Sequence, residues 1–310
     1  MWPPRTPAGH DRTVIEVAVP KARSLRTATG RVVGYYEYGA PSGRPVVAMH
    51  GTPASGAGYA WADAAARDLD VRIVAPDRPG IGASDPWRQR GARVVDYPSE
   101  LEAFVDALGI EQFRLLGYSG GGPYALACAH ALADRVEAIA VVAGAGNVGV
   151  WARTDEFEAT DRQLTFLSMR APVLARATLA ASAFVARTLP TISFRFALRE
   201  LSEPDRAVMR EFPSERDALM LFTEAVTRGT HGVVADYVAQ SQPWGFAVED
   251  IRVPMQCWHG TDDRTVPIRH SEELVARVPG AGLTRWEDAG HLALVQRIGE
   301  VLRALDDLAT

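Results

Sequence analysis

The chain has 310 residues, of which 47% are hydrophobic and 23% charged, and its formal net charge is −5. This size and composition are typical of a globular protein with one large α/β domain or two ordinary domains. Basic residues are spread out rather than grouped with aromatic ones, so nucleic acid is not an expected partner.

The sequence predicts neither a secretory signal nor a membrane span. Its start, MWPPRTPAGHDR, has no apolar core, so no secretory signal is predicted. No run of about 18 uncharged apolar residues occurs, and neither a membrane span nor a membrane partner is expected. Cys128 and Cys257 lie in apolar stretches and are expected to be buried free thiols. These features predict a cytoplasmic protein.

In chain order, short apolar runs that predict strands alternate with helical segments. In the first half, strands are expected at 13–20, 31–39, 46–51, 71–77, 113–118 and 136–144, and helices at 59–69, 96–109 and from 119 to about 132. Strands resume at 253–260 and 282–290, with helices at 269–278 and 293–308. Apolar runs without polar alternation are typical of a parallel sheet buried on both faces.

The strand signal disappears between 147 and 246. This region is helical and rich in arginine, and its apolar helix at 171–190 is expected to cover another part of the molecule. The predicted fold is therefore α/β, with a mostly parallel, doubly wound, eight-stranded sheet. Residues 1–146 and 247–310 are predicted to form its core, and residues 147–246 a helical cap, or lid, inserted into it.

The segment GYSGGG begins where the predicted strand 113–118 ends. Ser119 stands two residues from a glycine on each side, Gly117 and Gly121. A serine on a tight strand-to-helix turn has an unfavourable backbone conformation, and glycines at these positions relieve the crowding. Ser119 is therefore a candidate nucleophile, and the N–H group of Gly120 a candidate oxyanion donor at the start of a helix. A plain glycine turn is the alternative.

A serine nucleophile needs a base and an acid that orients the base. His291 directly follows the last predicted strand, in EDAGH, and is the candidate base. Asp262 and Asp263 follow the strand 253–260, and either could orient the imidazole. Thr52, in HGTP after the strand 46–51, is the candidate for a second oxyanion N–H donor. Taken singly, each of these residues is also explained by an ordinary turn.

The order Ser119, Asp263, His291, preceded by the HG-x-P loop, resembles the α/β-hydrolase superfamily. The segment DRPGIGASDP (77–86) is similar to that family's D-x-x-G-x-G-x-S loop. Gly260-x-x-Asp263 followed by a proline is similar to its acid loop, which favours Asp263 over Asp262. The glycine directly after Ser119 departs from the larger residue of many members.

The resemblance implies a catalytic triad of Ser119, Asp263 and His291, an oxyanion hole formed by Thr52 and Gly120, and no cofactor or metal. It implies a serine esterase that cleaves an ester, thioester or lactone of a small or medium apolar substrate through an acyl-enzyme. A serine at this position argues against haloalkane dehalogenase and epoxide hydrolase chemistry, for which the family uses an aspartate.

Three alternatives remain open. The same triad could perform amide or carbon–carbon bond hydrolysis, acyl transfer or perhydrolysis, or the pocket could belong to a non-catalytic small-molecule receptor. A structural or interaction protein is the third, and the complete catalytic set disfavours it most. His50 and His259 are expected to be structural. Tyr237, Trp244 and Phe246, where the insertion rejoins the core, are expected to pack rather than to wall the pocket.

Overall fold

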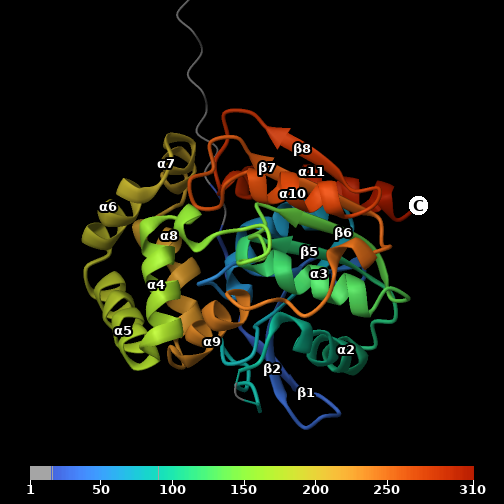
Figure 1. The fold of residues 1–310 in the computed structure, drawn as a ribbon, viewed down its shortest axis with the longest axis horizontal. Coiled ribbons are helices and arrows are strands. Elements are labelled where there is room, and N and C mark those ends of the chain that lie inside the picture. The colour runs from blue at the N-terminus through green and yellow to red at the C-terminus, as the bar shows by residue number, and fades with distance from the viewer. Residues whose placement is uncertain (1–14, 16, 90) are drawn as a thin grey trace, which may run out of the picture.

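The computed structural model describes residues 15, 17–89 and 91–310. A sheet lies at the centre of the molecule (Figure 1). It has eight strands in the order β1-β2-β4-β3-β5-β6-β7-β8. The pairs β1–β2 and β2–β4 are antiparallel, and all other neighbours are parallel. The predicted fold class, a mostly parallel eight-stranded sheet with helices, is confirmed.

The strands are β1 Arg23–Arg26, β2 Val32–Gly39, β3 Arg44–Met49, β4 Val71–Pro76, β5 Phe113–Tyr118, β6 Val136–Val142, β7 Met255–Gly260 and β8 Gly282–Trp286. The helices of the core are α1 Asp63–Asp68, α2 Pro98–Ala107, α3 Gly122–Ala131, α10 Arg269–Arg277 and α11 Ala293–Leu308. Between β6 and β7 lie α4 Ala159–Arg170, α5 Pro172–Thr188, α6 Pro190–Glu200, α7 Glu203–Met209, α8 Glu215–Thr223 and α9 His231–Gln240.

The strand expected at 13–20 is wrong for the described part of that range. Residues 15 and 17–20 form no strand, and residues 13, 14 and 16 lie outside the described residues. The N–H of Ile15 instead donates to the carbonyl of Glu211, which follows α7. The first strand, β1, comes after Pro20, whose missing N–H disfavours a continuous ladder. Gly30, at φ +80°, then turns the chain into β2.

Side chains of the central strands alternate between two apolar cores, one on each face of the sheet. Val46 and Ala48 of β3 pack in the core that also contains α1 and α11. Val47 and Met49 pack in the opposite core, with α2, α3 and α10. Both faces of the sheet are thus covered, as the uninterrupted apolar runs predict. Both cysteines are buried and free.

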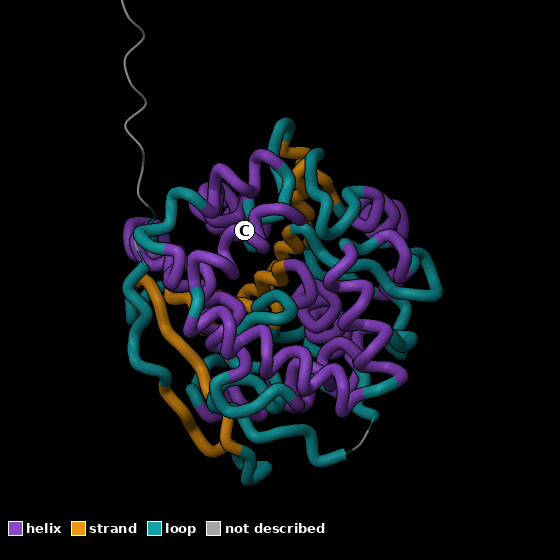
Figure 2. The backbone as a smooth tube through the Cα atoms, turned by 90° about the vertical axis from the view of Figure 1, so that its left-hand side faces the viewer, coloured by secondary structure: helices purple, strands orange, loops and turns teal. Residues whose placement is uncertain are grey.

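Helices α4 to α8 gather at one side of the molecule (Figure 1), and Figure 2 views the molecule from that side. The apolar helix expected to cover another part of the molecule corresponds to α5, and this expectation is only partly met. Its buried side chains are Ala175, Leu179, Ala183 and Ala186, whereas its larger apolar side chains are mostly exposed. Within the described residues, no helix is both long and apolar enough to cross a bilayer.

The candidate residues meet because parallel strands end at the same edge of the sheet. Thr52 follows β3, Ser119 follows β5, Asp263 follows β7 and His291 follows β8. Loops at the carboxyl ends of such strands form the usual ligand site of an open α/β sheet. The fold thereby places four segments that are distant in sequence around one pocket.

Candidate active site

The backbone of Ser119 is strained, and the tight turn that contains it is possible because the neighbouring glycines have no side chains. Its φ is +54°, a left-handed backbone conformation that is unusual for any residue other than glycine. A Cβ atom at Gly121 would lie 2.1 Å from the carbonyl oxygen of Met49, and one at Gly117 would lie 2.7 Å from Cβ of Ala125. The turn between β5 and α3 therefore requires glycine at both positions, and strain of this kind is concentrated at functional sites.

His291 joins Ser119 to Asp263. Its Nε2 lies 2.9 Å from Oγ of Ser119, and its Nδ1 lies 2.7 Å from Oδ2 of Asp263. The backbone of His291 is held as well, because its N–H donates to Asp205 at 3.1 Å and its carbonyl accepts from the hydroxyl of Tyr118 at 3.0 Å. Both ring nitrogens and both backbone polar groups of His291 thus have partners.

Asp263, rather than Asp262, faces the histidine. The carboxylate of Asp263 is buried and accepts the N–H groups of Thr265 and Val266 at 2.9 Å each. Burial alone would raise its pKa, but the imidazoles of His291 and His259 hold the pKa well below its usual range. Asp262 is exposed. The structure thus separates two adjacent aspartates that the sequence distinguished only by a resemblance.

His259 is a buried residue with hydrogen-bond partners, as expected. Its Nδ1 lies 2.7 Å from the hydroxyl of Ser271, and its Nε2 lies 2.8 Å from the carbonyl of Val266 and 3.1 Å from Asp263. His50 is equally enclosed, and burial together with the charge of Arg78 lowers its pKa to about 3. Neither histidine competes with His291 for Ser119.

Asp205, at the start of α7, reaches from the helical insertion to the loop that carries His291. Its side chain is 1% exposed and accepts the N–H groups of His291 at 3.1 Å and Leu292 at 2.7 Å. A Cβ atom at Gly290 would lie 2.3 Å from its carboxyl carbon, so this close approach needs glycine there. Burial alone would lower the pKa of His291, but Asp263, Asp205 and Asp161 raise it above its ordinary value.

We expect Asp205→Asn to shift the acid limb of the pH–rate profile to lower pH. His291 must be neutral to accept a proton, so activity is lost as the pH falls through its raised pKa. Removing the negative charge of Asp205 lowers that pKa, while a single amide oxygen leaves one buried N–H without a good acceptor. The variant should lose about 2 kcal/mol of stability and also lower kcat. The measurement is kcat/KM against pH for both proteins.

Asp217→Asn provides the matched control for Asp205→Asn. Ser202 and Asp205 at the start of α7 form the same local pair as Ser214 and Asp217 at the start of α8. Only Asp205 reaches the loop of His291. If both variants shift the acid limb equally, or neither does, Asp205 does not act through His291.

A buried ion pair fixes the loop that contains Thr52. Arg78, which follows β4, is 0% exposed, and its Nε lies 3.0 Å from Oδ1 of Asp236 on α9. Arg78 also donates to the carbonyls of His50 and Gly51 and to the hydroxyl of Thr52. The Thr52 hydroxyl in turn donates to Asp236 at 2.6 Å. The candidate oxyanion loop is therefore tied to the end of the insertion.

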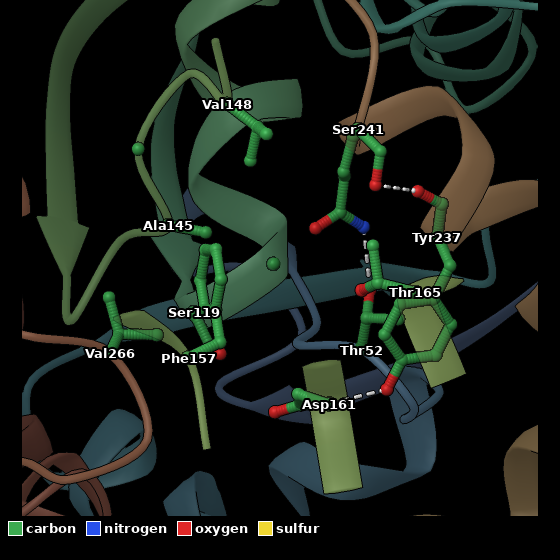
Figure 3. Close-up of a pocket in the computed structure, with 13 residues that line it drawn as sticks. Thr52, Ser119, Ala145, Val148, Phe157, Asp161, Thr165, Tyr237, Ser241 and Val266 are labelled. Atoms are coloured by element: carbon green, nitrogen blue, oxygen red, sulfur yellow. Dashed lines mark hydrogen bonds between the residues drawn. The ribbon is translucent and has the colours of Figure 1, made fainter. Parts of the chain in front are cut away.

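Thr52, Ser119 and Gly120 line one pocket (Figure 3). In that view, apolar Ala145, Val148, Phe157 and Val266 lie on one side, and Thr52, Tyr237 and Ser241 on the other. A Cβ atom at Gly120 would lie 2.7 Å from Oγ1 of Thr52 and 2.8 Å from Oε1 of Gln240. The glycine that departs from the family pattern thus leaves room for Thr52 and Gln240 at the pocket.

The insertion contributes side chains from its two ends to this pocket. Asp161 and Thr165 come from α4, and Tyr237 and Gln240 from α9. The hydroxyl of Tyr237 donates to Asp161 at 2.5 Å (Figure 3), so the expectation that Tyr237 only packs is wrong. Trp244 does lie in the apolar core, as expected. In the part of the chain that the structure describes, no group of three or more potential metal ligands is assembled.

The sequence did not indicate Asp205, Arg78, Asp236 or Tyr118 as parts of the site. Arg78 lies in the segment DRPGIGASDP, whose resemblance pointed to a loop but gave the arginine no role. Ser202 and Asp205 form a pattern that marks the start of a helix. Nothing in the local pattern around Asp236 distinguishes it from an ordinary polar residue on a helix.

A strained serine after a central strand, hydrogen-bonded to a histidine on a later loop in a mostly parallel sheet, is the arrangement of a hydrolase of the α/β class. The chain belongs to the alpha/beta hydrolase fold family, whose model matches residues 44–297.

Relatives of known sequence carry several different names. The chain is 31% identical over 171 residues to haloalkane dehalogenase 2 of Mycobacterium bovis, a match that spans 55% of each protein. It is 28% identical over 255 residues to a 2-hydroxy-6-oxononadienedioate/2-hydroxy-6-oxononatrienedioate hydrolase of Klebsiella pneumoniae, covering 80% of this chain and 81% of that one. The matches therefore agree on the family and differ on the reaction.

Solved structures show the same fold at lower identity. An esterase from Thermogutta terrifontis superposes with a TM-score of 0.66 at 18% identity, over 94% of this chain and 100% of the other. The enol-lactonase from Burkholderia xenovorans LB400 gives a TM-score of 0.64 at 20% identity, over 92% and 99%. These likenesses concern the fold.

Proposed function

We propose that the protein is a serine hydrolase that cleaves an ester, thioester or lactone of a small or medium, mainly apolar substrate. The observation that carries the proposal is the hydrogen-bonded chain from Ser119 through His291 to Asp263, with Ser119 facing the pocket. This order of partners and these distances suit transfer of the serine proton to the imidazole.

In the proposed mechanism, Ser119 attacks the substrate carbonyl while His291 Nε2 accepts its proton. Asp263 holds the Nδ1–H tautomer and stabilises the imidazolium that forms. The N–H groups of Thr52 and Gly120 donate to the tetrahedral oxyanion, an effect worth about 3 kcal/mol for each donor. His291 then protonates the leaving group, and a water that the same histidine activates releases the acid.

Residues 147–246 are proposed to act as a cap over this pocket. In support, Phe157, Asp161, Thr165, Tyr237 and Gln240 all line it. These side chains come from α4, α9 and the segment before α4, so α4 and α9, rather than α5, are the helices whose changes would alter substrate choice.

Carbon–carbon bond hydrolysis is the second candidate, because the Klebsiella relative matches over four fifths of both chains. Its printed name describes a dicarboxylate substrate. Among the residues that the structure describes, those lining the pocket include Asp161 and no arginine or lysine. The carboxylates of a dicarboxylate substrate would meet no cation among these residues and would lie near the carboxyl group of Asp161, so the pocket favours the uncharged ester. The aspartate that dehalogenases of this family use as nucleophile is replaced here by Ser119.

The proposal is tested by labelling with a fluorophosphonate and by turnover of p-nitrophenyl esters of increasing acyl length. We expect labelling at Ser119 and a preference for short or medium acyl chains. A folded protein that neither labels nor hydrolyses any ester would contradict the proposal and favour a receptor. Labelling with turnover of a 2-hydroxy-6-oxo dienoate alone would favour carbon–carbon cleavage.

A further inference from the structure

The helical insertion exposes an unusual number of large apolar side chains. Eleven are exposed among the described residues, and nine of these lie between positions 166 and 196. Val173 is 77% exposed, Phe184 67% and Phe166 63%. Isolated apolar residues on a surface are ordinary, but a concentration of this kind on one substructure marks an interaction site.

The same segment is strongly cationic. Residues 162–199 contain six arginines and no aspartate or glutamate, although the whole chain has a net charge of −5. The six are Arg162, Arg170, Arg176, Arg187, Arg195 and Arg199. Among the residues that the structure describes, none of the six forms an ion pair with a carboxylate. Their charges are therefore available to a partner.

Helical spacing puts apolar and cationic side chains on the same exposed faces. On α4, Arg162, Phe166 and Met169 follow one another at intervals of four and three residues, and all three are exposed. On α6, Ile192, Arg195, Phe196 and Arg199 follow the same pattern. Residues at these intervals lie on one side of a helix.

Helix α5 repeats the arrangement over a longer distance. Val173 and Phe184 are eleven residues apart, about three turns, and so are Arg176 and Arg187. Both arginines are exposed, and the guanidinium of Arg187 donates to the carbonyl of Thr223 at the end of α8. Because α5 packs against both α4 and α6, the exposed side chains of these three helices belong to neighbouring elements. We call these exposed residues of α4, α5 and α6 the arginine–apolar face.

We propose that the arginine–apolar face binds the surface of an anionic lipid bilayer. A bilayer offers a partner to both kinds of side chain. The phosphates of its headgroup layer would bind the arginines, and the hydrocarbon beneath them would take up the phenylalanine, valine and isoleucine side chains. This peripheral contact needs no spanning helix. It revises the expectation of no membrane partner, which rested on the absence of a long apolar run.

Two other occupants suit the face less well. A second copy of the chain in a two-fold contact would bring arginines against arginines, with no carboxylate of 162–199 to separate them. A nucleic acid would match the charge but would leave the large exposed apolar side chains without an apolar partner. One carboxylate does approach α6, because Glu215 accepts a hydrogen bond from Thr191 at the start of that helix.

Helix α4 links this face to the pocket. Its Asp161 and Thr165 line the pocket, whereas Phe166 and Met169 are exposed on the arginine–apolar face. The thickness of one helix, about 10 Å, therefore separates a bound bilayer from the pocket. The bilayer proposal itself does not depend on the proposed function, because binding is measured without turnover.

The test is co-sedimentation of the full chain with vesicles of phosphatidylcholine alone and of phosphatidylcholine mixed with phosphatidylglycerol. We expect binding to the mixed vesicles, little binding to the neutral ones, and weakening at high salt. Arg176→Gln and Arg195→Gln should each lower the partition coefficient about fivefold. Phe184→Ser and Phe196→Ser should each lower it roughly tenfold, since each removes a buried ring from the lipid.

Matched controls are Arg303→Gln on α11 and Val150→Ser in the segment before α4, both at exposed positions that are not part of the face. All variants alter exposed side chains, so thermal melting should be unchanged and a loss of binding is not a loss of folding. Absence of vesicle binding, or equal effects of face and control variants, would overturn the proposal. So would a dimer in sedimentation velocity that Phe184→Ser dissociates while vesicles are not bound.

Discussion

Ser119→Ala is expected to lower kcat roughly 10⁶-fold for any ester that the wild type hydrolyses. The change removes the one hydroxyl that lies 2.9 Å from His291 Nε2. Because alanine replaces serine at the same backbone φ of +54°, the turn keeps its strain and the variant should melt as the wild type does. The measurement is kcat for a p-nitrophenyl ester, together with fluorophosphonate labelling.

Ser241→Ala is the matched control for Ser119→Ala. Ser241 also lines the pocket, but its hydroxyl donates to the carbonyl of Tyr237 within α9. This variant should keep its activity within a few-fold. If Ser119→Ala retains turnover within tenfold of the wild type while it remains folded, the nucleophile is another group and the proposed mechanism is wrong.

The adjacent aspartates offer a second internal comparison for the same mechanism. Asp263→Asn should lower kcat roughly 10⁴-fold, because an amide favours the wrong tautomer of His291. Asp262→Asn changes an exposed side chain and should have little effect. Equal losses in the two variants would contradict the assignment of Asp263 as the orienting acid.

The sequence was sufficient for the elements and residues that depend on local pattern. Short apolar or strand-like runs predicted seven strands of the sheet, β2 to β8, and helix α11 begins and ends at the expected residues, 293 and 308. Ser119, Asp263 and His291 could be chosen because each follows such a run, and parallel strands end at one edge. Their catalytic roles, and the limits 147 and 246 of the cap, stay predictions.

Packing between distant segments could not be predicted in this way. Asp205 and His291 are separated by more than eighty residues, and their contact depends on how α7 lies against the loop after β8. The exposed side of helix α5 could not be predicted either. Its apolar residues suggested a covering role, but composition does not show which side of a helix is buried, and its largest side chains are exposed.

The buried pair of Arg78 and Asp236 is the second feature with a large expected effect. Arg78→Met should lower the free energy of unfolding by about 4 kcal/mol, because it leaves the carboxylate of Asp236, 3% exposed, without its cation. For a chain of this length, that corresponds to a fall of about 6 °C in Tm. Arg78→Lys should also be less stable than the wild type, since an ammonium group cannot reproduce the forked contacts of the guanidinium.

The paired variant Arg78→Met with Asp236→Leu distinguishes a lost interaction from an orphaned charge. Removing both charges should destabilise the protein by clearly less than the sum of the two single changes, as a double-mutant cycle of thermal or denaturant unfolding would show. Arg67→Met, which breaks the exposed pair with Asp63 on α1, should cost less than about 1 kcal/mol. A cost of Arg78→Met as small as that of Arg67→Met would contradict the importance of the buried pair.

The pH dependence of this stability has a defined sign. Burial alone would raise the pKa of Asp236, but Arg78 and the hydroxyl of Thr52 lower it below its ordinary value. A carboxylate with a lowered pKa contributes stability above its unfolded pKa of about 3.9, and the contribution is lost as the pH falls through the folded value. The stability difference between wild type and Asp236→Asn should therefore be largest near neutral pH and shrink in acid. Because Arg78 also holds the carbonyls of His50 and Gly51, Arg78→Met should lower kcat along with stability, which ties the stability of this pair to the geometry of the candidate oxyanion loop.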